Sequence, residues 1–341
     1  MSDVLPVPSI PLLSVRVPSM AWLERNPGDD DFLRWSEGQN VVGTTVRWTS
    51  PQVLRDRRSA GVPSIAGRGT DTVMAWRGSG TDRHIWFDRL RRLPDAVPGG
   101  TQYTWGAYGP AGAQYNKNFQ TGSFPVLAQY LGRIFMFWKT PPRITGEGSP
   151  AQPDYPERMH WSELIGNAWK TPVGESTFVS DFCALLGQGE VNTDDNIAVA
   201  EHAGLLYAAW RDRSTIRMRT YDGQRWSDVV APLNGGLSAS KIPALVSDGT
   251  RLHLAWRNVD DDHIAWSTLE GSGWSAPSTL YDRRTAGSPA MGATGRGIVM
   301  VWVGSTTPMA LWWSHHTNGE WSEQRPFTDR TMNTDLHVSL V

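Results

Sequence analysis

The chain is predicted to be all-β and built from one repeated four-stranded unit, for two reasons. First, an apolar strand ends in tryptophan six times along the 341 residues, and a second aromatic-bearing strand and a turn follow each time. These tryptophans are Trp22, Trp76, Trp138, Trp210, Trp256 and Trp302. Second, the chain is rich in glycine (34) and proline (23), which mark turns rather than continue helices.

The best-preserved repeat shows the unit clearly. Its strands are Pro243 to Val246, Arg251 to Trp256, His263 to Ser267, and Gly273 to Pro277. A period of about 45 residues with four strands per repeat is typical of the blades of a β-propeller. The sequence therefore predicts a six-bladed β-propeller of four-stranded antiparallel blades, with residues 1–341 forming a single domain.

The innermost strands follow from the positions of the tryptophans. Five are expected near residues 63–66, 125–129, 196–200, 243–247 and 289–293. The sixth is assigned to residues 336–341, which would pair beside residues 14–22 and close the ring. Val7-Pro8-Ser9-Ile10 resembles Val62-Pro63-Ser64-Ile65 and is the alternative sixth strand.

The third and fourth strands carry their own aromatic residues, which are expected to fill the space between blades. These are Trp35, Trp48, Trp86, Trp161, Trp169, Trp226, Trp266, Trp274, Trp313 and Trp321. Turns rich in Asp, Asn and Gly join the two strands, as at Asp222-Gly223 and Asn318-Gly319, because these residues tolerate left-handed turn geometry.

These Trp-rich repeats resemble those of six-bladed propeller lectins, including fucose-binding lectins. The turn from Thr220 through Asp222 and Gly223 to Trp226 also resembles the Asp-box of sialidase-like propellers, which is a structural turn in that family. Val15-Arg16-Val17-Pro18 is similar to the sialidase motif whose arginine holds a substrate carboxylate. Under that resemblance Tyr281 is the tyrosine nominated as a nucleophile.

Three irregular insertions are expected to gather on one face of the propeller. They lie near residues 106–123, 140–157 and 172–195. Long loops in a compact domain are usually functional, and the aromatic residues Tyr103, Trp105, Tyr108, Tyr115 and Phe119 would suit a lid over a pocket.

A cation directly follows the second-strand tryptophan in four blades, and these cations are candidate ligand-binding residues. They are Arg77, Lys139, Arg211 and Arg257, with Tyr108, Tyr115 and Tyr155 as aromatic partners on the loops. Arginine at the channel mouth could hold an acidic group through paired hydrogen bonds. The alternative is that the cations form structural salt bridges with Asp82, Asp212 or the acids at 260–262.

The repeated segments Asp56-Arg57-Arg58-Ser59-Ala60-Gly61 and Asp282-Arg283-Arg284-Thr285-Ala286-Gly287 are assigned to blade-joining loops. No histidine spacing indicates a metal site, and no cofactor is expected. The alternative is a calcium site, for which the runs of three aspartates at 29–31 and 260–262 would supply carboxylate ligands.

The net charge and the lack of targeting segments limit the classes of partner that are expected. A net charge of −2 gives no basic field for nucleic acid, and no apolar run reaches the roughly 20 residues of a membrane span. No signal peptide is recognised and there is a single cysteine, Cys183, so a cytoplasmic location is expected, with release by another route left open.

The predicted function is lectin-like binding of a carbohydrate or an acidic small molecule at the loop face. The alternative is an enzyme with one pocket under the insertions, for example a glycoside hydrolase using two acids. Candidate acids on the insertions are Glu147, Asp154, Glu157, Asp181, Glu190, Asp194 and Asp195. A protein-interaction scaffold is the third hypothesis.

Overall fold

The computed structural model describes most of the chain, in ranges separated by gaps. These are residues 19–24, 32–42, 45–50, 52–67, 71–92, 103–105, 114–139, 159–170, 196–232, 238–271, 273–295, 297–306, 310–331 and 338–340. The regular structure of these residues is β-strand, with no α-helix. None of the described segments contains a helix that could cross a membrane.

Six sheets form from the described residues, and each is called a blade, numbered from the sheet containing β1. The first strands of blades 1 to 6 are β27 (Val338–Leu340), β5 (Ser64–Ala66), β10 (Val126–Tyr130), β14 (Ile197–His202), β17 (Ala244–Ser247) and β22 (Ala290–Thr294). The second strands are β1 (Ser19–Glu24), β6 (Val73–Arg77), β11 (Arg133–Lys139), β15 (Leu205–Asp212), β18 (Leu252–Arg257) and β23 (Gly297–Val303). The third strands are β2 (Phe32–Val42), β7 (His84–Arg92), β12 (Met159–Ile165), β16 (Thr215–Tyr221), β19 (His263–Glu270) and β24 (Ala310–Thr317).

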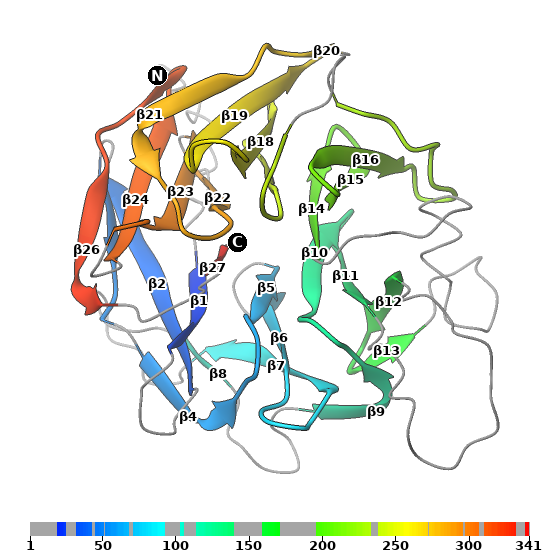
Figure 1. Cartoon of the computed structure of the whole chain (residues 1–341). Coiled ribbons are helices and arrows are strands. Elements are labelled where there is room, and N and C mark those ends of the chain that lie inside the picture. The colour runs from blue at the N-terminus through cyan, green and yellow to red at the C-terminus, as the bar shows by residue number, and fades with distance from the viewer. Residues whose placement is uncertain are drawn as a thin grey trace, which may run out of the picture.

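The first strands follow one another around a common centre (Figure 1). In chain order each lies against the next, from β5 to β22, and β27 lies against both β22 and β5. β27 also pairs antiparallel with β1, with Ser339 opposite Ala21. The prediction that the C-terminal segment joins the first blade is confirmed for residues 338–340. The alternative at Val7 to Ile10 lies outside the described residues.

The fourth strand is broken into two parts in most blades. The part next to the turn comprises β3 (Thr45–Trp48), β8 (Tyr103–Trp105), β13 (Ala168–Lys170), β20 (Gly273–Trp274) and β25 (Glu320–Trp321). The second part comprises β4 (Gln52–Arg58), β9 (Gln114–Gln120), β21 (Ser278–Arg284) and β26 (Arg325–Thr331). Both parts pair with the same third strand, as β20 and β21 do with β19.

A serine after the fourth-strand tryptophan ties this break to the third strand. Ser322 Oγ accepts the His315 N–H at 3.1 Å, and Ser314 Oγ donates to the Ser322 carbonyl at 2.8 Å. In blade 5, Ser275 and Ser267 make the equivalent bonds, both at comparable distances. The repeated Trp-Ser pair is therefore structural, because it satisfies backbone groups where the ladder is interrupted.

Tryptophan packing between blades forms the core. Of the described third- and fourth-strand tryptophans predicted to fill this space, five are buried, namely Trp35, Trp161, Trp169, Trp226 and Trp313, whereas Trp86, Trp266, Trp274 and Trp321 are partly buried. The six tryptophans that end the second strands are at most 3 % exposed. Each hydrophobic cluster draws side chains from neighbouring blades, for example Val246 of blade 5 with Trp302 of blade 6. A single blade cannot bury its faces alone, so this packing is what joins the repeats.

The Asp-Arg-Arg repeats lie in strands β4 and β21 rather than in loops, so that part of the sequence prediction is wrong. Arg57 reaches blade 2, where its Nη2 donates to Asp88 Oδ2 at 2.5 Å, and both side chains are 3 % exposed. Arg283 reaches blade 6, where its guanidinium lies 5.8 Å and 5.6 Å from the ring centres of Trp302 and Trp321. The alternation of the strand turns the middle residue of each repeat toward the next blade.

Of the three expected insertions, only part of the first is described. Residues 114–120 form β9, which pairs with β7, instead of an irregular loop. The expected insertions at 140–157 and 172–195, and the motif at Arg16, lie outside the described residues.

We expect deletion of residues 334–341 to lower the melting temperature by more than about 5 °C. The truncation removes β27 from β1 and exposes strand edges between blades 6 and 2. Differential scanning calorimetry of the two proteins measures this. Equal melting temperatures would show that β27 does not hold the ring together.

We expect Arg57→Ala to lower the free energy of unfolding by about 3–5 kcal/mol, because it leaves the buried Asp88 carboxylate without its partner. Arg55→Ala is the matched control, since Arg55 is exposed on the same strand and should change stability by about 0.5 kcal/mol or less. Urea denaturation of both variants provides the comparison. A similar small effect of both would mean that the Arg57–Asp88 pair is energetically neutral.

Candidate functional site

The four predicted cations lie at or near the C-terminal ends of their second strands. Three of them, Arg77, Arg211 and Arg257, donate side-chain hydrogen bonds to other residues of the chain. Arg257 donates from Nε to the Thr285 carbonyl at 2.8 Å, from Nη1 to Ser240 Oγ at 2.8 Å, and from Nη2 to the Asp262 carboxylate. The structural alternative is therefore the better description of Arg257. Arg211 Nη1 donates to the Arg213 carbonyl at 2.5 Å.

Arg77 and Lys139 are similarly enclosed. Arg77 Nη1 donates to the Gly122 carbonyl at 3.3 Å, and burial lowers the pKa of its guanidinium. The side chain of Lys139 is 6 % exposed. A charged group held in this way has lost part of its freedom to reorient toward a ligand.

The backbone carbonyls at these positions also accept hydrogen bonds from the segment that leads into a first strand. The carbonyls of Arg77 and Lys139 accept hydrogen bonds from Ser59 Oγ at 2.8 Å and Thr121 Oγ1 at 2.9 Å. The Arg257 carbonyl accepts the Ser240 N–H at 3.0 Å. The repeated cation position is therefore also a position where the backbone carbonyl accepts a hydrogen bond from the segment that leads into the first strand of the same blade.

The structure places one of the three predicted tyrosines. Tyr115 lies on β9, with its backbone opposite Trp86 of β7. Tyr108 and Tyr155 lie outside the described residues. Tyr281 is on β21, 78 % exposed, with its ring 5.7 Å from the ring of His263.

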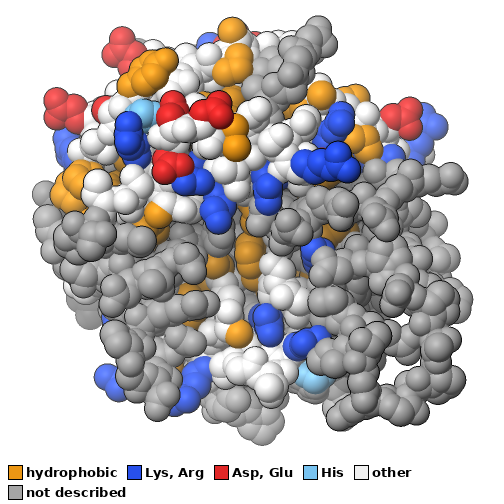
Figure 2. Space-filling view, viewed as in Figure 1, with side chains coloured by type: hydrophobic (Ala, Val, Ile, Leu, Met, Phe, Trp, Pro, Cys, Tyr) orange, Lys and Arg blue, Asp and Glu red, His pale blue; other side chains and the backbone are white. Residues whose placement is uncertain are grey.

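An apolar pocket of about 140 Å³ occupies the centre at the cation end of the strands. Its walls come from the start of the first strands of five blades, and include Ile65, Leu127, Val199, Leu245 and Met291. Figure 2 shows hydrophobic side chains in the central hollow of one face, with Lys and Arg side chains around it. This region offers an apolar surface, with few groups for orienting a polar ligand.

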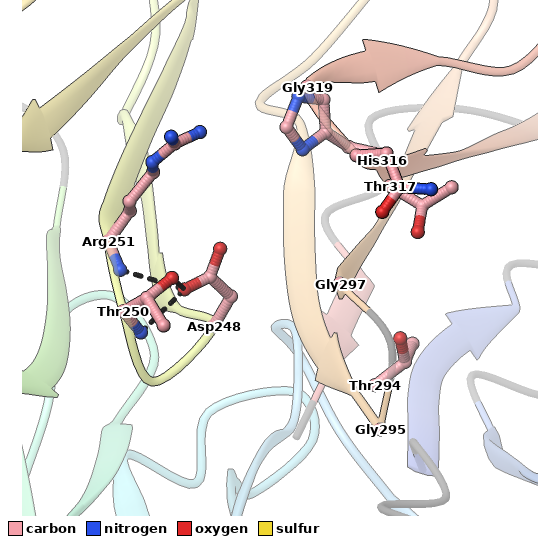
Figure 3. A pocket seen from close by; sticks show the side chains of 10 residues that line it. Asp248, Thr250, Arg251, Thr294, Gly295, Gly297, His316, Thr317 and Gly319 are labelled. Carbon is pink, nitrogen blue, oxygen red and sulfur yellow. Dashed lines mark hydrogen bonds between the residues drawn. The ribbon is translucent and has the colours of Figure 1, made fainter.

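A second pocket, of about 400 Å³, lies between blades 5 and 6 at the opposite end of the strands. It is formed by the turns that join β17 to β18, β22 to β23 and β24 to β25. Its lining residues are Asp248, Thr250, Arg251, Thr294, Gly295, Gly297, His316, Thr317, Asn318 and Gly319. In Figure 3, Asp248, Thr250 and Arg251 face Thr294, His316 and Thr317 across the pocket.

Asp248 organises the blade 5 side of this pocket. Its Oδ1 accepts the backbone N–H groups of Thr250 and Arg251 and the Thr250 hydroxyl, each at 2.7 Å. Its Oδ2 lies 2.8 Å from Nε2 of His253, which is fully buried. Burial acts to raise the pKa of the Asp248 carboxyl, but the bonds from His253, Thr250 and Arg251 outweigh it and hold the pKa well below its usual range.

Arg251 leaves the same turn toward solvent. Its Nε lies 3.1 Å from Glu270 Oε1, and both side chains are about half exposed, at 43 % and 57 %. The contact with Glu270 is made by Nε and orients the guanidinium. The two terminal nitrogens, Nη1 and Nη2, take no part in this contact, and they are groups that can donate paired hydrogen bonds to two oxygen atoms.

His316 forms the blade 6 side of the pocket and crosses the junction. It is 4 % exposed, and its ring centre lies 5.3 Å from His253, 4.8 Å from Trp266 and 5.0 Å from Trp321. Its Nε2 is buried with no hydrogen-bond partner among the described residues. Burial lowers the pKa of His316 to about 4, and the neighbouring His253 acts in the same direction.

Both histidines occupy positions that carry neither a histidine nor a charged residue in the other blades. His316 pairs with the fourth-strand tryptophan Trp321, and the residues that pair with the corresponding tryptophans are Gly38, Leu90, Leu164, Tyr221 and Leu269. His253 lies three residues before the second-strand tryptophan, where the other blades have Ser19, Val73, Phe135, Tyr207 and Val299. Alignment of the repeats by strand register is the signal that would have found both residues.

Neighbouring junctions are bridged differently at this end. Between blades 3 and 4, the Tyr130 hydroxyl donates to the Gly204 carbonyl at 3.0 Å, and Leu131 N–H donates to Glu201 Oε2 at 2.9 Å. Between blades 4 and 5, His202 Nδ1 lies 2.9 Å from Ser247 Oγ. The junction of blades 5 and 6 therefore has its own arrangement of polar groups.

The aspartates at 260–262 act within the fold. Asp261 Oδ1 accepts the His263 N–H at 3.1 Å, and Asp262 binds Arg257. Within the described ranges, no three His, Cys, Asp or Glu side chains gather in a way that could hold a metal ion.

Comparison with known proteins identifies similar folds. No protein-family model matches the chain, and no curated protein matches it by sequence. A mutant of the Aleuria aurantia lectin in complex with Fucα1-6GlcNAc is 15 % identical over 91 % of this chain and 94 % of that chain, with a TM-score of 0.53. AofleA from Arthrobotrys oligospora is 9 % identical over 91 % of this chain and 83 % of that chain, with a TM-score of 0.54.

A third similar structure, TolB from Acinetobacter baumannii, is 11 % identical over 94 % of this chain and 66 % of that chain, with a TM-score of 0.52. The Aleuria lectin is described as a six-bladed β-propeller. At these identities the likeness establishes an all-β propeller fold that resembles the propeller lectins.

We expect the protein to lose stability as the pH falls from 6.5 toward 4. The pKa of His316 is about 4 in the fold against an ordinary value of 6.5, so the folded state favours the neutral ring and the unfolded chain binds the extra proton. The contribution is fully present above pH 6.5, and about 2 kcal/mol of it is lost at pH 5.

Urea denaturation at pH 7.5 and pH 5 measures this loss. His316→Leu, which introduces the residue found at the equivalent position of blade 5, should remove that part of the pH dependence. His84→Gln, in blade 2 where His84 is about one-quarter exposed, should retain it. An unchanged pH dependence in His316→Leu would contradict the assignment.

Proposed function

We propose that the protein is a carbohydrate-binding propeller that takes its ligand in the pocket between blades 5 and 6. The observation that carries the proposal is the pair of buried histidines beside a polar pocket, at repeat positions that carry no charged residue in the other blades. Departures from a repeat pattern that leave buried polar atoms unpaired cost stability, and such departures are expected at functional sites.

The pocket has the size and chemistry for a small hydroxylated ligand. A volume of about 400 Å³ lies within the usual range of ligand pockets, about 300–1,000 Å³. Arg251 supplies donors, and the hydroxyl groups of Thr294 and Thr317 line the opposite wall. Asp248 already accepts four donors, so its role is to hold the turn in place.

The similar folds support this class of ligand. The Aleuria lectin structures are described as complexes with fucosides, and the AofleA structure has the same general architecture. We also propose that residues 1–341 form one closed six-bladed ring. The succession of first strands and the pairing of β27 with β1 support that arrangement.

A second candidate site is the loop face predicted from the ring of cations. The basic side chains around the central hollow favour it for an acidic ligand (Figure 2). Arg211 and Tyr115 are the residues whose replacement would affect that site.

A glycan array followed by calorimetric titration tests the proposal. We expect one site per chain, and we expect Arg251→Ala to weaken binding about ten- to a hundredfold, because a hydrogen bond from a charged donor contributes about 1.5–3 kcal/mol. Arg225→Ala is the matched control, since Arg225 is 88 % exposed on a neighbouring blade.

Loss of affinity in Arg211→Ala and Tyr115→Ala, with Arg251→Ala unaffected, would move the ligand to the loop face. Several equivalent sites per chain would instead indicate a symmetric lectin. Absence of binding to any glycan on the array would remove the carbohydrate proposal.

A further inference from the structure

We propose that the junction between blades 5 and 6 is an acid-operated switch: uptake of protons by its buried histidines separates the two blades at this end and releases the ligand. The ligand part rests on the function proposed above, whereas the separation of the blades does not. The inference starts from two imidazoles at one junction. His253 is fully buried, and His316 is 4 % exposed.

The geometry joins the two blades through these rings. His316 belongs to blade 6, but it packs against His253 and Trp266 of blade 5. A charge on His316 would lie inside this aromatic contact, where it cannot be hydrated while the blades stay together. Separation of the blades at the turns exposes the ring to water and removes that cost.

The charged groups around His316 give it little compensation. From the turn of blade 5 come Asp248, which is already bonded to His253, and Arg251, which is paired with Glu270 of β19. His202 of blade 4 also acts electrostatically on His253 of β18, in the direction that lowers the pKa of His253.

On the blade 6 side, the guanidinium of Arg283 lies over Trp321. His315 lies on the other face of β24, opposite Val299, which packs toward blade 1. Positive groups therefore outnumber carboxylates around the rings once the histidines are charged. Burial lowers the pKa of His253 and His316 alike, so both resist protonation while the junction is closed.

The other junctions have no residue that becomes protonated in acid at the position of His316. The residues equivalent to His316 are Gly38, Leu90, Leu164, Tyr221 and Leu269, which do not gain charge in acid. Opening should therefore be local to the pocket, whose walls are the turns of blades 5 and 6.

The size of the effect follows from linkage. An exposed histidine has a pKa of about 6.5, and His316 in the closed junction has a pKa of about 4. Acidification from pH 7.5 to pH 5 should then raise the equilibrium constant for opening about 30-fold through His316 alone.

Hydrogen–deuterium exchange of the full chain tests the opening without any ligand. After correction for the intrinsic pH dependence of exchange, residues 244–257 and 310–317 should lose protection about 30-fold between pH 7.5 and pH 5. Residues 126–139 of blade 3 serve as the internal control and should keep theirs. Unchanged protection at the junction, or equal loss in blade 3, would overturn the switch.

His316→Leu should keep its protection at pH 5, and His84→Gln should behave like the parent protein. If His316→Leu does not fold, His316→Phe is the second variant, because an aromatic residue occupies the equivalent position in blade 4. Loss of junction protection in a folded non-titrating variant, at the same pH as in the parent, would also overturn the proposal.

Titration with methyl α-L-fucoside links the switch to the pocket. The dissociation constant of the parent should rise at least tenfold from pH 7.5 to pH 5, and the ratio should fall to near one in His316→Leu. A constant affinity while exchange shows opening would refute the ligand release. If the probe fails to bind at pH 7.5, that result counts against the proposed function, and the exchange measurement still decides the switch.

Discussion

Burial of tryptophan between neighbouring sheets is the interaction on which the rest of this structure depends. Each second strand delivers one indole that is almost completely buried, and each hydrophobic cluster contains side chains from adjacent blades. Among the described residues each hydrophobic cluster spans at least two blades, so the sheets stabilise one another as neighbours. The turns at both ends of the strands are then held at fixed distances, and they supply the walls of the pockets.

Most of the fold could be predicted from the sequence, because the repeat carries it. The Trp256 repeat, read together with its strand spacing, located the first strands to within one or two residues, as β17 and β22 show. The two parts of the fourth strand could not be predicted in the same way. The break depends on serine hydroxyls that replace ladder hydrogen bonds, and Ser275 or Ser322 looks like an ordinary turn residue when only the sequence is read.

The candidate site was harder to predict, because a residue that recurs from repeat to repeat looks functional in the sequence even when its role is structural. Arg257 attracts notice by its repetition, yet the structure uses it to join Ser240, Asp262 and Thr285. His316 is visible in the sequence only as an exception to the repeat, and its contact with His253 joins equivalent regions of two consecutive blades. Electrostatic consequences of such a contact depend on burial, which the spacing of residues does not give.

The arginines of the Asp-Arg-Arg segments have a consequence for assembly of the chain. A protein made of similar units risks pairing each unit with the wrong neighbour during folding. Here Arg57 requires a carboxylate from the following blade, whereas Arg283 requires two indole faces, and Tyr130 marks another boundary with a hydroxyl bond. Exchange of two blades would bury an arginine without its partner, so these boundary contacts specify which blade packs against which.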